Sequence, residues 1–104
     1  MKPGPFHLRA DEEGVLWLSG ELDLSQADTF TASAAALVNG NPEVTLDCSE
    51  LTFLDSSGIR AIFQLASRAE SRVIIRNPTE NVRKVFAIVG IDGQMGVRVE
   101  PSGP

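Results

Sequence analysis

The sequence predicts one α/β domain in which a small mixed sheet has helices packed mainly on one face. The chain has 104 residues, which is the length of a single domain. Apolar residues make up 42% of it and charged residues 22%, as in ordinary globular proteins. Segments with strand-like and helix-like apolar spacing alternate in the order ββαβαβαβ. This order is typical of parallel strands joined by crossover helices.

The first two strands are expected to form a hairpin. Residues 6–9 alternate apolar and polar side chains, as a half-buried strand does. Residues 15–18 form a second short strand after the polar turn at residues 11–14. Trp17 is expected to lie in the core because its strand is apolar throughout.

The first helix is expected to begin at Ser25, because residues 25–28 form a variant of the capping box with Asp28 in the place of glutamate. Its buried face would hold Ala27, Phe30, Ala34, Leu37 and Val38. Asn39 and Gly40 provide the C-terminal stop, and the following proline blocks continuation. The β-forming residues 44–48 then predict the third strand.

The second helix follows a polar corner at residues 55–58. Its apolar positions have the spacing of an amphipathic helix: Ile59, Ile62, Phe63 and Ala66. The wholly apolar residues 73–75 predict a strand in the buried centre of the sheet.

The third helix is expected to start with Asn77 as N-cap, Pro78 at the first position and Glu80 at the third. Its buried stripe would hold Val82, Val85, Phe86 and Val89, with Gly90 as the stop. Residues 97–99 form the last short strand. The prediction is therefore a single domain over residues 1–104, with frayed ends at 1–5 and 101–104.

Composition excludes several classes of function. The net charge of −5 argues against nucleic-acid binding. No apolar run approaches the ~20 residues of a membrane span, and nothing at the N-terminus resembles an export signal. The single Cys48 cannot form an internal disulfide and is expected to be a small buried hydrophobe. These observations predict a cytoplasmic protein, monomeric by default, that binds neither nucleic acid nor membrane.

Catalytic and metal sites are not expected. The sequence contains no glycine-rich phosphate loop and no serine-hydrolase elbow. One histidine, His7, and one cysteine cannot build a zinc site of the usual kind. A serine nucleophile would also need an adjacent base, and none lies in a recognisable motif.

The charge is distributed unevenly along the chain. Residues 1–55 carry a net charge of −8 and residues 56–104 a net charge of +3. This asymmetry has two interpretations, which the sequence leaves open. The acids are either ordinary solvated faces or a surface patch that meets a basic protein partner.

The most informative segment is the corner Asp55-Ser56-Ser57-Gly58. In a purely structural interpretation, Ser56 or Asp55 caps the second helix and Gly58 allows a tight corner. Alternatively, one of the two serines is a phosphoacceptor, because a hydroxyl at a helix N-terminus is accessible to a kinase. Its phosphate would add about −1.5 to −2 charges beside Asp55 and would meet free N–H groups at the positive end of the helix. The helix would then persist while the surface changes.

Two further groups of polar residues have open interpretations. Glu21 and Asp23 alternate with leucines, so both carboxylates are expected on one face of an extended segment. They are either a solvated strand end or neighbours of the Ser56 corner at the carboxyl edge of the sheet. The polar face of the second helix is either solvated or borders a binding surface that starts at Ser56; it holds Arg60, Gln64, Ser67 and Arg68.

Residues 20–24 (Gly-Glu-Leu-Asp-Leu) and 46–60, which contain the Asp-Ser-Ser-Gly corner, together resemble bacterial anti-sigma factor antagonists of the STAS domain family. The resemblance extends over nearly the whole chain. It implies a curved sheet with helices packed on one side. It also implies a partner that is both an anti-sigma factor and a serine kinase.

By this resemblance, the unphosphorylated chain binds the anti-sigma factor and frees the sigma factor. Phosphorylation of Ser56 with ATP, which is the kinase's cofactor and not this chain's, ends the complex, and a serine phosphatase restores it. Ser57 is the second choice as acceptor. The residues expected at the partner are Glu21, Asp23, Asp55, Ser56, Ser57, Gly58 and Arg60. Because STAS domains also occur in other assemblies, the alternative is a constitutive regulatory or structural subunit of a transporter or stress-signalling complex.

Overall fold

The computed structural model describes residues 6–38, 40–90 and 96–100. The predicted frayed ends and the predicted stop residue Asn39 lie outside the described residues. The elements follow the predicted order ββαβαβαβ. They are β1 (His7–Ala10), β2 (Leu16–Leu22), α1 (Leu24–Val38), β3 (Glu43–Leu54), α2 (Ser56–Ala69), β4 (Arg72–Arg76), α3 (Glu80–Val89) and β5 (Val97–Val99).

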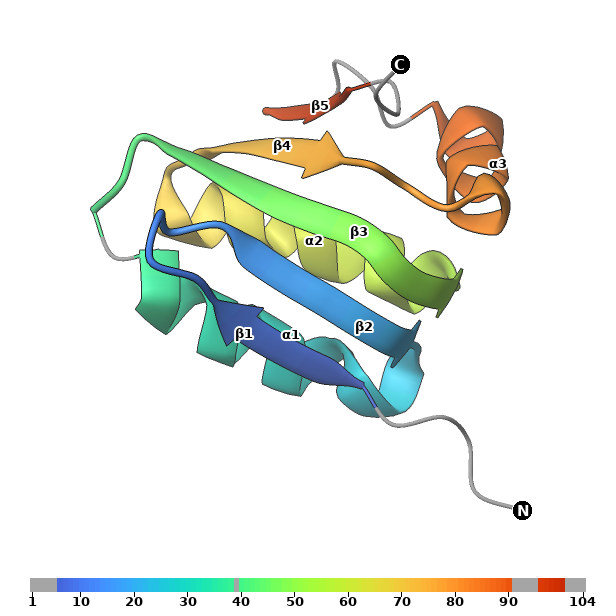
Figure 1. Cartoon of the computed structure of the whole chain (residues 1–104), viewed down its shortest axis with the longest axis horizontal. Coiled ribbons are helices and arrows are strands. Elements are labelled where there is room, and N and C mark those ends of the chain that lie inside the picture. Colours follow the sequence, from blue (N-terminus) through green and yellow to red (C-terminus); the bar gives the residue numbers. More distant parts are fainter. Residues whose placement is uncertain (1–5, 39, 91–95, 101–104) are drawn as a thin grey trace.

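The five strands form one mixed sheet in the order β1-β2-β3-β4-β5 (Figure 1). The predicted hairpin is confirmed, because β1 pairs antiparallel with β2. The pairs β2–β3, β3–β4 and β4–β5 are all parallel, as crossover connections require.

The Asp11 carboxylate organises the turn of this hairpin. One oxygen accepts hydrogen bonds from the amides of Glu13 and Val15, each at 2.9 Å. The other accepts the indole N–H of Trp17 at 2.9 Å. The hydrogen bond from Trp17, helped by the two amides, holds the pKa of Asp11 below its ordinary value.

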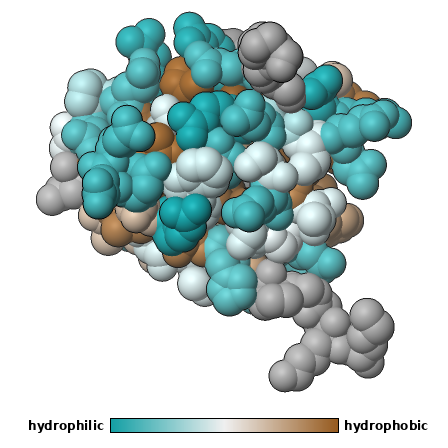
Figure 2. Space-filling view, in the orientation of Figure 1, coloured by the Kyte–Doolittle hydropathy of each residue, from teal (hydrophilic) through white to brown (hydrophobic). Residues whose placement is uncertain are grey.

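Trp17 does not lie in the core, contrary to the prediction. Leu16 and Leu18 are buried on the helix side of β2, so Trp17 between them points to the other face of the sheet. There its ring lies 4.9 Å and 5.4 Å from the guanidinium carbons of Arg9 and Arg76. This helix-free face is largely hydrophilic (Figure 2). The period of the strand, and not its overall apolar character, decides which way the indole points.

A buried ion pair crosses the same face. The Asp47 carboxylate is 1% exposed and accepts the Arg76 Nε–H at 2.8 Å. Ser49 and Asn77 also donate hydrogen bonds to it. Burial raises the pKa of Asp47, but the hydrogen bonds from Ser49, Arg76 and Asn77 outweigh burial and hold it below its ordinary value. Asp47 thus ties β3 to β4 and to the start of the β4–α3 connection.

The helices α1 and α2 lie side by side on one face of the sheet, as predicted, and the core fills the space between them and the strands (Figure 1). The third helix lies beyond the end of β4, beside the last part of β3 (Figure 1). Thr79 fixes it there, because its hydroxyl donates to the Leu51 carbonyl of β3 at 2.9 Å. Cys48 is fully buried, as expected, and burial raises the pKa of its thiol to about 12.

Two predicted helix starts are wrong by one to three residues. The first helix begins at Leu24, so Asp23 precedes it and Ser25 is already helical. The third helix has Thr79 as N-cap and not Asn77, whose φ of 53° is left-handed. Asn77 cannot start a helix here because its side chain is engaged with Asp47.

The buried faces of two helices also differ from the prediction. Leu37 of α1 is 49% exposed, and Thr31 is buried in its stead, with its hydroxyl donating to the Ala27 carbonyl. In α3, Val82 and Phe86 are buried as predicted, whereas Val85 is half-buried and Val89 is 49% exposed. The predicted stop is confirmed, since Gly90 caps α3 with a left-handed φ of 71°. Within the described ranges, none of the helices combines the length and the hydropathy that a membrane span needs.

Candidate functional site

The candidate site is the corner where β3 passes into α2. Asp55 is the N-cap of α2, with extended backbone, and its Oδ1 accepts the amides of Ser57 at 2.9 Å and Gly58 at 3.1 Å. Of the two predicted caps, Asp55 is therefore the correct one, and Ser56 is the first helical residue. Ser56 is exposed to solvent, whereas Ser57 is only partly exposed.

This arrangement corrects one detail of the expected phosphate environment. The sequence predicts free N–H groups at the start of the helix for a phosphate on Ser56. In the structure the amides of Ser57 and Gly58 already donate to Asp55. A phosphate on Ser56 would therefore lie beside a carboxylate that already occupies the amides of Ser57 and Gly58.

Gly58 holds the corner against the end of β2, but not by allowing a tight turn. Its φ is not left-handed, and it lies inside the first turn of α2. A Cβ atom at this position would be 2.6 Å from the Leu22 carbonyl oxygen and 2.8 Å from Cδ1 of Leu54. Only glycine therefore allows α2 to start this close to the paired ends of β2 and β3.

The acidic segment at the end of β2 adjoins the corner, as one of the two interpretations expected. Leu22 pairs with Leu54, and Glu21 with Phe53, in the parallel ladder. The amide of Asp55 also points to the Leu22 carbonyl, at 3.5 Å. Glu21 and Asp23 are thus brought to the same edge of the sheet as Asp55.

Glu21 and Asp23 have different local roles. The Asp23 carboxylate accepts the amide of Ser25 at 3.0 Å and its hydroxyl at 2.7 Å, and so orders the start of α1. The expected alternation of leucines and acids ends at Leu24, which is helical and 77% exposed. Phe53, opposite Glu21, is 46% exposed. Two large apolar side chains therefore accompany the acids at this edge.

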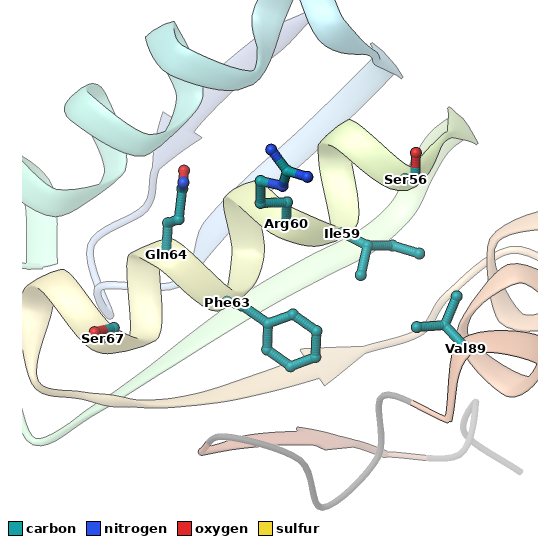
Figure 3. Close-up of a pocket in the computed structure, with 7 residues that line it drawn as sticks. All are labelled: Ser56, Ile59, Arg60, Phe63, Gln64, Ser67 and Val89. Atoms are coloured by element: carbon teal, nitrogen blue, oxygen red, sulfur yellow. The ribbon is translucent and has the colours of Figure 1, made fainter.

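A groove runs from the corner along α2 (Figure 3). It has a volume of about 500 Å³, and Ser56 stands at one end of it. Its wall is mainly apolar, and Val89 reaches it from α3 (Figure 3). The lining residues are Ser56, Ile59, Arg60, Phe63, Gln64, Ser67 and Val89. Of the polar face, Arg60, Gln64 and Ser67 line this groove with Ser56, whereas Arg68 does not. That the surface binds a partner stays a prediction.

The sequence did not reveal the apolar wall of this groove. Phe63 and Val89 were expected inside the core, because helical spacing marks an apolar stripe without showing how wide the covered part is. In the structure Phe63 is half-buried and Val89 is 49% exposed, and both line the groove. Partial exposure of both residues is what turns the edge of the core into a groove.

Chemistry at the corner is limited to what a lone hydroxyl offers. In the described part of the chain, no base is hydrogen-bonded to Ser56. Nor do the described residues contain three His, Cys, Asp or Glu side chains grouped so that they could hold a metal ion.

The family model described as "Mlab, STAS domain" matches residues 7–99. No curated protein matches the chain in sequence. Among solved structures, the unphosphorylated anti-sigma factor antagonist SpoIIAA is similar at a TM-score of 0.63 and 24% identity, over 93% of this chain and 89% of that one. An anti-sigma factor antagonist from Mycobacterium paratuberculosis is similar at a TM-score of 0.68 and 21% identity, over 91% and 85% of the two chains. At these identities the structural likeness supports the fold.

Proposed function

This chain belongs to the STAS domain family, and on that premise we propose that it acts as an anti-sigma factor antagonist. In this proposal it is a cytoplasmic binding protein and not an enzyme. Its partner is an anti-sigma factor that is also a serine kinase. The observation that carries the proposal is the exposed Ser56, which stands at the mouth of an apolar groove and beside the carboxylate of Asp55.

The unphosphorylated corner offers the partner a surface of mixed character. The groove supplies partly exposed apolar side chains, Phe63 and Val89 among them. The neighbouring acids Glu21, Asp23 and Asp55 add negative charge at the sheet edge. Burial of the apolar wall would drive association, and the charges would select a basic partner surface. Binding to this surface keeps the anti-sigma factor from its sigma factor.

Phosphorylation of Ser56 would weaken this association without unfolding the chain. The kinase transfers a phosphoryl group from ATP, and the product carries about −1.5 to −2 charges at the groove mouth. Asp55 keeps the amides of Ser57 and Gly58, so the cap of α2 stays in place. The added dianion and its hydration shell stand at an apolar groove, so the cost of desolvating the phosphate and the bulk it adds would weaken the complex by several kcal/mol. A serine phosphatase would restore binding.

Three substitutions test this proposal in one pull-down experiment. The immobilised wild type and Ser56→Ala should retain an anti-sigma factor kinase, while Ser56→Asp should not. The matched control is Ser33→Asp, because Ser33 is exposed on α1 and does not line the groove, and this variant should retain the kinase as the wild type does. Equal retention by Ser56→Asp and wild type would overturn the proposal. Circular dichroism of Ser56→Asp should remain native-like.

Intact-mass measurement identifies the acceptor. After incubation with the retained kinase and ATP, wild type should gain one phosphate and Ser56→Ala none. A phosphate on Ser56→Ala that is absent from a Ser57→Ala variant would instead assign Ser57 as the acceptor.

The second candidate is a constitutive subunit of a transporter or stress-signalling complex. The matching family model describes a STAS domain and names no phosphorylation, so it is compatible with this candidate as well. A constitutive subunit would take up no phosphate from the kinase. In the pull-down, the wild type and Ser56→Asp would also retain equal amounts of the same partner.

A further inference from the structure

The charge of Arg60, near the Ser56 corner, has no partner that the fold supplies among the residues the structure describes. It is exposed on α2 and lines the groove with Ser56 (Figure 3). In the described part of the chain its guanidinium takes part in no ion pair, whereas Arg72, Arg76 and Arg98 each have a carboxylate partner. Arg60 therefore keeps its charge available in the unmodified protein.

The helix places Arg60 one turn after Ser56. Side chains four residues apart share one face of a helix, with Cβ atoms roughly 5–6 Å apart. Figure 3 shows that the Ser56 hydroxyl and the Arg60 guanidinium point to the same side of α2. An anionic group that precedes a cationic one by four residues is also the favourable orientation, because it agrees with the helix dipole.

The two backbone amides that follow Ser56 are already occupied. The amides of Ser57 and Gly58 donate to the Asp55 carboxylate, which itself repels a dianion. A phosphoserine needs donors and positive charge, and the planar guanidinium supplies both through paired N–H groups. Arg60 lies within reach of this position along the helix.

We propose that Arg60 is the counter-ion of a phosphate on Ser56, forming an ion pair within α2 when that serine is phosphorylated. This inference rests on the proposed function, which supplies the modification. It adds a second effect to the switch: the phosphate introduces negative charge at the groove and also withdraws the guanidinium that the unmodified surface offers to a partner carboxylate.

The test uses phosphoserine incorporated at position 56 during synthesis, so that no kinase or partner is required. Phosphorus NMR follows the second ionisation of the phosphate, which has a pKa of about 6 in the absence of partners. Arg60→Gln should raise this pKa by about 0.3 relative to the phosphorylated wild type, as expected for an exposed pair at this spacing. Arg60→Lys should recover part of the difference, and molar salt should remove it.

The matched control is Arg68→Gln. Arg68 is exposed on the same helix, but it lies twelve residues from Ser56, or roughly 18 Å along the axis. That is beyond the screening length of about 8 Å at physiological salt, so this substitution should leave the phosphate's pKa unchanged.

The outcomes separate this inference from the proposed function. Equal phosphate pKa values in the wild type and Arg60→Gln would overturn the ion pair, even if Ser56→Asp abolishes partner binding. An equal shift in Arg68→Gln would also overturn it, because the effect would then be one of net charge. A shift specific to Arg60 supports the pair, even if the pull-down fails to retain any kinase.

Discussion

Replacing Gly58 by alanine should destabilise the chain, although alanine is the better helix former. The new Cβ atom would lie 2.6 Å from the Leu22 carbonyl oxygen, where ordinary contacts are 3.4–4 Å. The Leu54 side chain can rotate away, but the Leu22 carbonyl belongs to a strand that is paired through Leu22 and Leu54. The start of α2 must therefore move away from the sheet by nearly an ångström.

The expected magnitude follows from two opposing terms. Overpacking against a fixed backbone costs about 1–3 kcal/mol. Alanine recovers up to about 1 kcal/mol of helix propensity relative to glycine. With the middle of the overpacking range, the free energy of unfolding should fall by about 1 kcal/mol. With a denaturant dependence of about 1–3 kcal/mol per molar urea, the unfolding midpoint should fall by roughly 0.3–1 M.

Urea unfolding followed by the fluorescence of Trp17, the only tryptophan, measures this midpoint. The control is Ser67→Ala, an exposed position of the same helix, where the midpoint should stay or rise slightly because only propensity changes. A midpoint for Gly58→Ala at or above that of the wild type would refute the close-approach argument. It would mean that α2 can shift at no cost, and the position of Ser56 would then not be fixed.

Two further predictions concern buried groups on β3. Asp47→Asn should lower the free energy of unfolding at pH 7 by roughly 2 kcal/mol, because Arg76 loses its anionic partner. Glu80→Gln, which breaks an exposed pair, should cost under about 0.5 kcal/mol in the same urea titration. Because the pKa of Asp47 is below its unfolded-state value of 3.8, its contribution is complete above that pH and is lost as the pH falls below it. Wild type and Asp47→Asn should therefore converge in stability below about pH 4, and a gap that persists at pH 2 would contradict the ion-pair assignment. Cys48, with its pKa raised to about 12, should react with a thiol reagent at pH 8 more than about 100-fold slower in the native chain than in urea, and comparable rates would contradict its burial.

The order of elements could be predicted because it depends on local apolar spacing, whereas the helix starts could not. Ser25 and Asn77 are both good capping residues in isolation. In the structure Ser25 donates its amide and its hydroxyl to Asp23, which stands just before the helix. Asn77 is engaged by Asp47, a residue of another strand. The choice of a cap thus depends on competing partners, one a near neighbour in sequence and the other 30 residues away.

The corner itself could be found from sequence, but the groove beside it could not. The segment Asp55-Ser56-Ser57-Gly58 carries its own signal, since a capping carboxylate, a hydroxyl and a glycine are adjacent. The groove is lined by residues of α2 and by Val89 of α3, so it depends on where α3 lies. Thr79, just before α3, donates a hydrogen bond to Leu51 of β3, a residue 28 positions away in the sequence.

The third strand shows a different limit. It has 12 residues in the structure, whereas the sequence predicts a strand of only five, residues 44–48. A strand buries every second residue, and β3 does so at Val44, Leu46 and Cys48. The next buried residues are Leu51 and Leu54, so the spacing changes from two to three. Each change coincides with a register shift against β2, where β3 has one residue more than its partner. A search for strict alternation ends at Cys48, although the strand continues.

These two bulges decide where Ser56 emerges. One extra residue in a strand turns every later side chain to the opposite face, and a second one turns them back. Leu54 consequently faces the core again, and α2 starts on the helix side of the sheet. The second bulge is held by the Thr52 hydroxyl, which donates to the Gly20 carbonyl of β2 at 3.0 Å. The direction in which the Ser56 side chain faces therefore depends on β3. The phosphate proposed for Ser56 would change the surface charge at this point without changing the strand that leads to it.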